Sequence, residues 1–341
     1  MFKSSSVSDL KRPGSVVSTT SVASSCLNTV KISTARHRNF LVGQKDSHSS
    51  LIGAAELDRL LPDRTIDVFF GTWNIGETKV MPSGIEDFLL PTDLEYVASM
   101  IVVTVQEAAM DRKMWEVGLQ EVIGLNHVLY HSAQHGSLHI AVFIKRDLIW
   151  FCSTPEDGAV SVRMYTPLRT KGAVAVSFTL FGTSLCFIGS HFQASEGNEK
   201  ARTLDYKMVN ESLKLPQAIV INPLQKSHKE MSNRFDCVFW AGDFNFRITK
   251  NRERVINMIN AKQHHEHPHF ENLLDNDELT LAMNNDEIFQ SYQEGRVTFP
   301  PTYKFDRGEL YLKSVSLLYS TQSTYDLSLK DTVEEDLIAT V

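Results

Sequence analysis

Several segments of the chain are rich in β-branched and aromatic residues and are bounded by Gly, Pro or polar residues, the pattern typical of strands in a packed sheet. Apolar positions elsewhere recur at intervals of three to four residues, which is typical of helices that pack on one face. Strands interleaved with helices favour an α/β fold in which two sheets pack face to face and helices lie outside. The predicted strands are 66–73, 100–106, 138–145, 149–153, 173–180, 184–191 and 236–242, and the predicted helices are 54–61, 112–123 and 196–213.

Length and composition favour one large folded domain preceded by a tail. With 341 residues, 42% of them hydrophobic and 22% charged, the chain can bury one α/β core and has little room for a second full domain. Residues 1–50 are rich in Ser and Thr, poor in aromatic residues and carry scattered Lys and Arg. We therefore predict a disordered, basic, Ser-rich tail over 1–50.

Charge and cysteine content narrow the class of protein. A formal net charge of -7 argues against a nucleic-acid-binding protein, because binding to a phosphate backbone depends on clustered Lys and Arg. The four cysteines are too few and too scattered for a disulfide framework, so a reducing compartment is expected. The N-terminus lacks the apolar core of a signal peptide, and no apolar run is long enough for a transmembrane helix. We predict a cytoplasmic protein that meets membranes only peripherally, and its oligomeric state stays open.

Polar residues end four of the predicted strands where a simple core strand would continue with apolar ones. These residues are Asn74, Glu107, His191 and Asp243. Four strands that each deliver such a group imply one site at one edge of the sheet core. After Asp243, the residues Asn245 and Arg247 follow at alternate positions, so an extended segment would bring all three to one rim.

These strand ends carry a resemblance to a known family. The ordered motifs resemble those of the inositol polyphosphate 5-phosphatases, and within that family the type IV, phosphoinositide-preferring branch. The family motifs are Gly71-Thr72-Trp73-Asn74, Gln106-Glu107, Ser190-His191-Phe192, the run from Trp240 to Arg247, and Phe299-Pro300-Pro301-Thr302-Tyr303-Lys304-Phe305-Asp306; those of the branch are Leu51-Ile52-Gly53-Ala54-Ala55-Glu56-Leu57, Asp147-Leu148-Ile149-Trp150-Phe151-Cys152 and Thr170-Lys171-Gly172-Ala173.

The resemblance implies a fold and a domain organisation. The family fold is a four-layered sandwich of two packed mixed β-sheets flanked by helices, as in DNase-I-like nucleases. It implies a catalytic domain over 51–306. The remaining segment, 307–341, departs from the family pattern, so we expect the sandwich to lack its C-terminal strands.

The resemblance also implies catalytic roles for the strand-end residues. Hydrolysis of a phosphate monoester needs a metal that neutralises charge, a base that orients water, and donors around the phosphoryl oxygens. Glu107 is the expected ligand of Mg²⁺, which prefers oxygen ligands and keeps several waters. Asp243 is the expected base, and we expect burial among aromatic residues to raise its pKa. Asn74 and Asn245 supply amides, and His191 can hydrogen-bond the scissile phosphate or protonate the leaving oxygen.

Cationic residues are expected to bind the other phosphates of a phosphoinositide headgroup at a membrane surface. Lys provides a flexible point charge and Arg a planar fork for phosphate oxygens. By resemblance, Tyr303 and Lys304 lie near the phosphate adjacent to the one removed. The expected substrate-binding residues are Lys171, Arg169, Tyr303, Lys304 and Arg247.

The sequence after Asp306 leaves two alternatives beside the enzyme. Relatives in the family continue to an Asp-Arg pair and a Ser-Asp-His segment, and this chain contains no Asp-His dipeptide. The first alternative is a catalytically impaired, truncated form that lacks terminal strands and only binds phosphoinositides or a partner. The second alternative is a nuclease of the same fold. No prenylation box closes the sequence.

Overall fold

The computed structural model describes residues 58–91, 97–163, 171–219, 228–250, 252–262, 271–297, 299 and 336–340. The predicted tail over 1–50 lies outside these residues, as does most of the helix predicted at 54–61, of which 58–60 are described and helical. Within the described ranges, no helix is long and apolar enough to cross a bilayer.

The first sheet is mixed and is built from the N-terminal part of the described chain. Its order is β1 (Val68–Asn74), β2 (Met100–Gln106), β4 (Leu138–Lys145) and β3 (His127–His135). β1 runs parallel to β2, whereas β4 is antiparallel to both β2 and β3. The predicted bounds of β2 and β4 are confirmed, and those of β1 differ at its ends.

The second sheet is also mixed. Its order is β5 (Glu156–Ser161), β6 (Gly172–Leu180), β7 (Thr183–His191), β8 (Cys237–Asp243), β10 (Asp336–Thr340) and β9 (Tyr292–Glu294). β6, β7 and β8 match the predicted strands to within a residue. β10 comes from the divergent segment 307–341 and lies parallel to both β8 and β9. The expected lack of C-terminal strands therefore does not hold for this strand, which fills a place inside the sheet.

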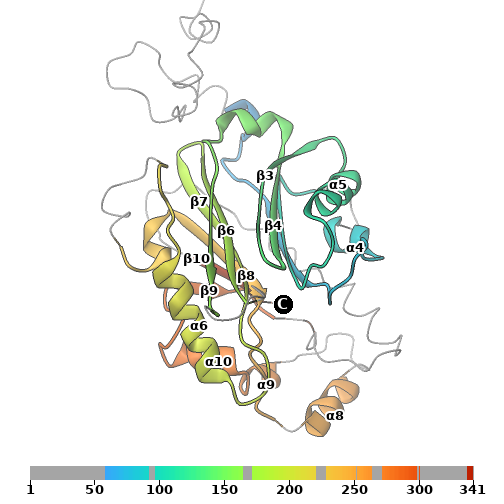
Figure 1. Ribbon diagram of the computed structural model, residues 1–341, viewed down its shortest axis with the longest axis vertical. Helices are drawn as coiled ribbons and strands as arrows, with labels where there is room; N and C mark the ends of the chain where they lie inside the picture. Colours follow the sequence, from blue (N-terminus) through green and yellow to red (C-terminus); the bar gives the residue numbers. More distant parts are fainter. Residues whose placement is uncertain are drawn as a thin grey trace, which may run out of the picture.

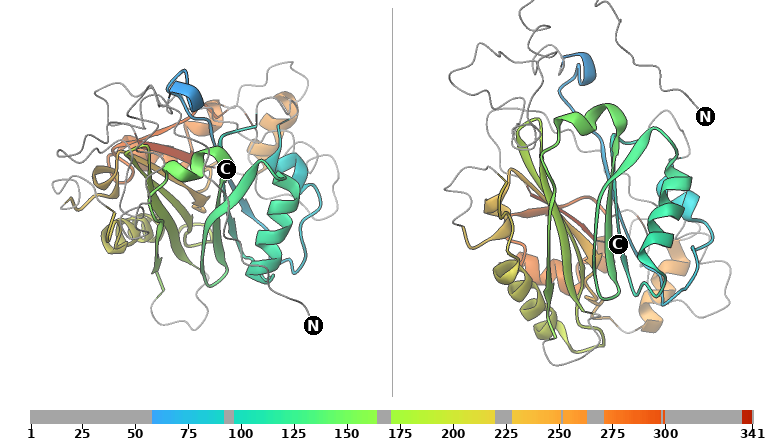
Figure 2. Two further views of the ribbon diagram at one scale, coloured as in Figure 1. Left: turned by 90° about the horizontal axis from the view of Figure 1, so that it is seen from above. Right: turned by 45° about the horizontal axis from the view of Figure 1, so that its top comes forward.

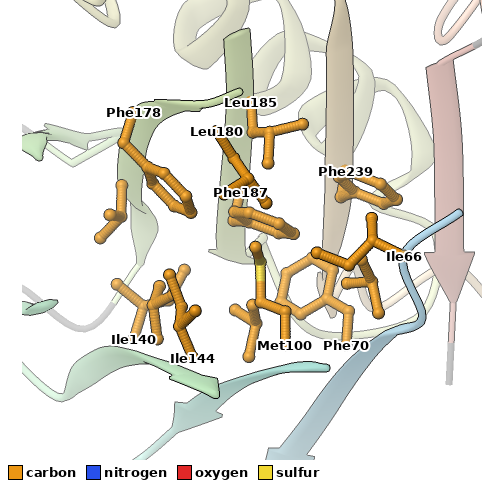
Figure 3. Close-up of a cluster of buried hydrophobic side chains, with 14 of the residues drawn as sticks. Ile66, Phe70, Met100, Ile140, Ile144, Phe178, Leu180, Leu185, Phe187 and Phe239 are labelled. Carbon is orange, nitrogen blue, oxygen red and sulfur yellow. The ribbon is translucent and has the colours of Figure 1, made fainter. Parts of the chain in front are cut away.

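The main hydrophobic core lies between the two sheets. Figure 3 shows Phe70, Met100, Ile140 and Ile144 of the first sheet facing aromatic and aliphatic side chains of the second. Phe70 meets Phe187 edge to face, with ring centroids 5.6 Å apart. Each fully buried side chain of this size stabilises the fold by about 1.5–3 kcal/mol. This core holds the sheets together and so fixes the relative positions of their strand ends.

Helices cover the outer faces of both sheets, as Figures 1 and 2 show. α4 (Ile85–Leu89) and α5 (Arg112–Ile123) lie on the first sheet, with the predicted bounds of α5 confirmed. α6 (Glu199–Ser212) and α10 (Glu278–Asn284) lie on the second, α6 beginning three residues later than predicted. α8 (Arg252–Lys262) and α9 (Glu271–Leu274) join β8 to α10. The expected four-layered sandwich is confirmed.

One predicted strand is wrong. Residues 149–153 do not form a strand, because 146–151 form the 3₁₀-helix η2 (Arg146–Phe151). Leu148 and Phe151, three residues apart, are buried, while Trp150 is 75% exposed. A spacing of three matches the period of a 3₁₀-helix. The apolar run is too short to distinguish this period from the two-residue period of a strand.

Candidate active site

Parallel pairing brings the strand-end residues to one edge of the molecule. β1 and β2 are in register from Val68 to Asn74, so Asn74 lies beside Gln106 and one residue from Glu107. β7 and β8 are in register so that His191 lies beside Asp243. The sheets approach closely near this edge, since a Cβ atom on Gly189 would lie 2.0 Å from Oγ1 of Thr104.

The backbone changes direction as β8 reaches Asp243. Gly242 has φ of +149°, and a Cβ atom there would lie 2.1 Å from the carbonyl oxygen of Ser190, so only glycine fits. Asn245 has a left-handed backbone with φ of +60°. Non-glycine residues in this region cluster at functional sites, where the surrounding structure holds them.

Asp243 is at the centre of the site. Its Oδ2 accepts a hydrogen bond of 2.9 Å from Nδ2 of Asn74, which comes from the other sheet. The same oxygen lies 3.3 Å from Nε2 of His191, whose side chain is 1% exposed. Oδ1 accepts from the backbone N–H of Asn245 at 3.2 Å. The structure therefore brings Asn74, His191, Asp243 and Asn245 together as the sequence predicts.

The expected direction of the Asp243 pKa shift is wrong. Burial acts to raise the pKa of this carboxyl, as we expected. The hydrogen bond and charge of His191, the amide of Asn74 and the Lys171 ammonium outweigh it, so the pKa is lowered from its ordinary value of 3.8. Asp243 is consequently ionised at neutral pH.

Lys171 is the buried cation of the site. It precedes β6, and its Nζ contacts Nε2 of His191. Burial lowers its pKa to about 8, and Arg163 acts in the same direction, whereas the Asp243 and Glu107 carboxylates act to raise it. Lys171 is therefore mostly charged at neutral pH and loses that charge just above it.

Glu107 is the most accessible carboxylate of this group. Its side chain is 36% exposed and its Oε1 lies 3.8 Å from Nε2 of His191. Its backbone is left-handed with φ of +55°, and its carbonyl accepts from the N–H of Glu77 at 2.8 Å. The turn after β2 thus directs this carboxylate toward the site.

The donor set fits a hard cation held by few protein ligands. Among the described residues, no group of three or more His, Cys, Asp or Glu side chains is arranged to hold a metal ion. Mg²⁺ keeps several waters and needs only one or two protein carboxylates. An exposed carboxylate beside an amide and an ionised aspartate suits such an ion, with Glu107 as the candidate ligand.

Asn245 and Arg247 have partners within the protein. Nδ2 of Asn245 donates to the carbonyl oxygen of Phe192 at 3.2 Å, and its Oδ1 accepts from Nη2 of Arg247 at 2.6 Å. The Asn245 amide thus ties the end of β7 to the segment after β8. Arg247 lies at the same rim, as the alternation after Asp243 predicts.

Three predicted substrate-binding residues, Arg169, Tyr303 and Lys304, lie outside the described residues. Conversely, the structure adds Arg163 and Asp205, whose charges act on the pKa of Lys171. Arg163 donates to Oε1 of Gln193, and Oδ2 of Asp205 accepts from the backbone N–H of Gln193 at 2.8 Å. The sequence could have identified Asp205, because it is a charged residue on the inward-packing face of the helix predicted over 196–213.

Comparison with known proteins places this geometry in a family context. Residues 71–317 match the family model described as Endonuclease/Exonuclease/phosphatase family 2. The chain is 41% identical over 288 residues to the phosphatidylinositol polyphosphate 5-phosphatase type IV of Mus musculus, covering 84% of this chain and 44% of the relative. It is 30% identical over 270 residues to synaptojanin-2 of Rattus norvegicus, covering 78% of this chain and 16% of the relative. The chain thus spans less than half the length of these relatives.

A solved structure has a similar fold. The inositol polyphosphate 5-phosphatase domain of SPsynaptojanin, crystallised with inositol (1,4)-bisphosphate and a calcium ion, superposes with a TM-score of 0.58 and 26% sequence identity. The match covers 82% of this chain and 78% of that domain. Both the fold and the matched relatives therefore agree with the resemblance seen in the sequence.

Proposed function

The chain belongs to endonuclease/exonuclease/phosphatase family 2, and we propose that it hydrolyses the 5-phosphate of phosphoinositides. The proposed substrates are phosphatidylinositol 4,5-bisphosphate and phosphatidylinositol 3,4,5-trisphosphate, presented at a membrane surface. The observation that carries the proposal is the arrangement around Asp243, which is hydrogen-bonded by Asn74 and lies beside His191 and Lys171. The named activity of the relatives supports the substrate class.

Asp243 is the proposed base that orients the attacking water. Its lowered pKa keeps it ionised, so it can accept a hydrogen bond and then the proton from water. The water oxygen bonds to phosphorus as the bond from phosphorus to the inositol oxygen breaks. The leaving oxygen takes a proton, and inorganic phosphate is released.

His191 and Lys171 are suited to the charge and proton that this step moves. Nε2 of His191 faces the carboxylates of Asp243 and Glu107 and contacts Nζ of Lys171, so it is the ring nitrogen that can exchange a hydrogen bond or a proton with the site. An Nε2–H group can donate to Asp243 in the resting site and to a phosphoryl or leaving oxygen during the reaction. The Lys171 ammonium adds a positive charge where negative charge develops.

Mg²⁺ is the proposed metal, and Glu107 would hold it, with waters completing its oxygen ligands. When bound, such an ion neutralises charge on the phosphoryl oxygens. The calcium ion crystallised with the similar domain supports a divalent cation as the metal. Arg169, Tyr303, Lys304 and Arg247 are proposed to bind the remaining headgroup phosphates, because Lys and Arg suit phosphate oxygens.

The test measures phosphate release from short-chain forms of both proposed lipids, with and without Mg²⁺. The intact chain is compared with Asp243→Asn, and circular dichroism checks that both are folded. We expect Mg²⁺-dependent release from the intact chain and a loss of about 1,000-fold in Asp243→Asn, the scale of general acid–base catalysis. Asp157→Asn is the matched control, because Asp157 is exposed and pairs with His131 rather than with the site.

Three outcomes would contradict the proposal. A folded chain that binds the lipids without releasing phosphate would be a binding protein. Cleavage of duplex DNA in place of phosphate release would make it a nuclease. Equal rates for the intact chain and Asp243→Asn would remove Asp243 from the mechanism.

A further inference from the structure

Helix α6 carries one fully buried and one half-buried charged side chain that the proposed mechanism does not use. Arg202 is completely buried, and Asp205 lies one turn further along the helix. Burial of an unpaired charge is very costly, so such residues have specific partners. The partners of Arg202 and Asp205 show what these residues hold in place.

Arg202 contacts the two segments that follow the catalytic strands. Its guanidinium donates from Nη1 to the carbonyl oxygen of Ser195 at 2.9 Å, in the segment after His191. The guanidinium carbon lies 5.3 Å from the ring centre of Phe246, in the segment after Asp243. Nη2 forms an ion pair with Oε2 of Glu278 at the start of α10.

Glu278 extends this contact toward Asp243. Its Oε2 also accepts from the backbone N–H of Arg247 at 2.8 Å, and its own N–H donates to the carbonyl oxygen of Arg247 at 2.9 Å. The Arg247 side chain bonds to Asn245, whose N–H donates to Asp243. A continuous series of contacts therefore links Arg202 to the catalytic carboxylate.

Asp205 acts on the segment after β7. Its Oδ2 accepts from the backbone N–H of Gln193, two residues after His191. Arg202 and Asp205 lie three residues apart, so they share one face of α6. That face holds the end of β7 and, through Glu278, the segment after β8.

We propose that Arg202 and Glu278 are positioning residues that hold the segments after His191 and Asp243 in the geometry the reaction requires. This inference rests on the proposed function and goes beyond it, because neither residue reaches the reacting atoms. A role in stability alone is a poor explanation. Replacing a buried ion pair with apolar residues is often neutral for stability, whereas apolar residues could not hydrogen-bond the backbone of Ser195 and Arg247.

The first variant is Glu278→Gln, which keeps the size of the side chain but removes its charge. The second is the double variant Arg202→Met with Glu278→Leu, which leaves no unpaired buried charge and so guards against a failure to fold. Glu116→Gln is the matched control. Glu116 pairs with Arg112 on α5, on the other face of the molecule.

The reaction readout separates positioning from binding. We expect kcat to fall about 100-fold in the double variant while KM changes less than about threefold, since misplacement of catalytic groups by 1 Å can cost this much. Glu278→Gln should lie between the double variant and the intact chain, and Glu116→Gln should match the intact chain. Unchanged kcat in folded variants would overturn the inference, as would an equal loss in Glu116→Gln.

Amide hydrogen exchange provides a readout that needs no turnover. In both variants, amides of 192–195 and 244–247 should exchange at least tenfold faster, while those of β2 and β4 keep their rates. If the intact chain releases no phosphate, the proposed function fails but this exchange pattern still tests the positioning role. If the amides of 192–195 and 244–247 exchanged at the same rates in the variants as in the intact chain, the positioning role would be overturned.

Discussion

Helices α5 and α6 cover the outer faces of the two sheets but bury very different side chains. α5 packs through Trp115, Leu119 and Ile123, and its ion pair between Arg112 and Glu116 is partly exposed. α6 packs through Tyr206 and Val209 but also buries Arg202 completely. One helix therefore contributes mainly apolar packing, and the other also holds backbone segments next to the site.

The sheets beneath these helices differ in a related way. The first sheet supplies Asn74 and Glu107, an amide and an exposed carboxylate at the ends of adjacent parallel strands. The second supplies His191 and Asp243 from its strand ends and Lys171 from the residue before β6. Strand pairing and the turn after β2 position the residues of the first sheet, whereas those of the second also depend on segments held by α6. The two halves should therefore respond differently to substitution.

Among the site residues that the first sheet supplies, replacement of Glu107 should reduce activity the most. Glu107→Gln keeps the shape but removes the charge of the candidate metal ligand. We expect activity at 1 mM Mg²⁺ to fall by about 100-fold or more, because a bound cation supplies several kcal/mol of charge stabilisation. Titration with Mg²⁺ should show partial recovery. Glu121→Gln, on the exposed face of α5, is the control, and an unchanged metal requirement in Glu107→Gln would rule out Glu107 as the ligand.

Asn74 joins the two sheets at the site, and its replacement should have the second largest effect. Asn74→Ala removes the 2.9 Å hydrogen bond to Asp243. A hydrogen bond to a charged group contributes about 1.5–3 kcal/mol, so we expect a loss of roughly 10- to 100-fold in kcat/KM. This bond lowers the pKa of Asp243, so the acid limb of the pH profile should move to higher pH in the variant. Asn126→Ala, at an exposed position, should leave the profile unchanged, and an unmoved acid limb in Asn74→Ala would contradict the assignment.

Much of this arrangement could be predicted from the sequence, for physical reasons that differ between regions. The bounds of α5, β2 and β4 follow from continuous local patterns and were confirmed. β3 was missed because its residues His127–His135 are mostly polar and follow no clean alternation. The strand ends were predicted to meet at one edge, and the parallel register of β7 and β8 brings them there.

Long-range electrostatics was the part that the sequence could not provide. The predicted direction of the Asp243 pKa shift was wrong because only burial was considered. Asn74 and His191 also act on this pKa, and their proximity depends on the register and packing of strands distant in sequence. The ion pair between Arg202 and Glu278 joins residues 76 positions apart. Neither the contacts of Asp243 nor this ion pair leaves a local pattern in the sequence, because both depend on how the sheets and helices pack.

Lys171 should determine the alkaline limb of activity, an effect about tenfold in size. Its pKa of about 8 means that the folded site loses this charge as pH rises through 8, so activity should fall there. Lys171→Arg keeps the charge at alkaline pH. The ratio of activity at pH 9 to that at pH 7 should be about tenfold higher in the variant, since about nine-tenths of Lys171 is neutral at pH 9. Lys113→Arg, at an exposed position on α5, is the control, and equal ratios in Lys171→Arg and the intact chain would exclude Lys171 as the titrating group.

His139 tests the α5 side of the comparison and should affect stability rather than activity. It lies on β4, is 1% exposed, and neither ring nitrogen has a hydrogen-bond partner among the described residues. Burial lowers its pKa to about 4, so between pH 6.5 and 4 the unfolded chain takes up a proton that the folded chain excludes. Folding stability should therefore fall as pH drops through this window, by on the order of 3 kcal/mol from this group. His139→Leu should remove that loss, seen as a smaller shift of the urea midpoint between pH 7 and pH 5, while His131→Gln should keep it. Among the described residues, no hydrogen bond or ion pair joins the His139 side chain to Asn74, Glu107, His191 or Asp243. The kcat of His139→Leu at pH 7 should therefore equal that of the intact chain. A loss like that of the Arg202 and Glu278 double variant would show that the first sheet also positions the site through its buried residues.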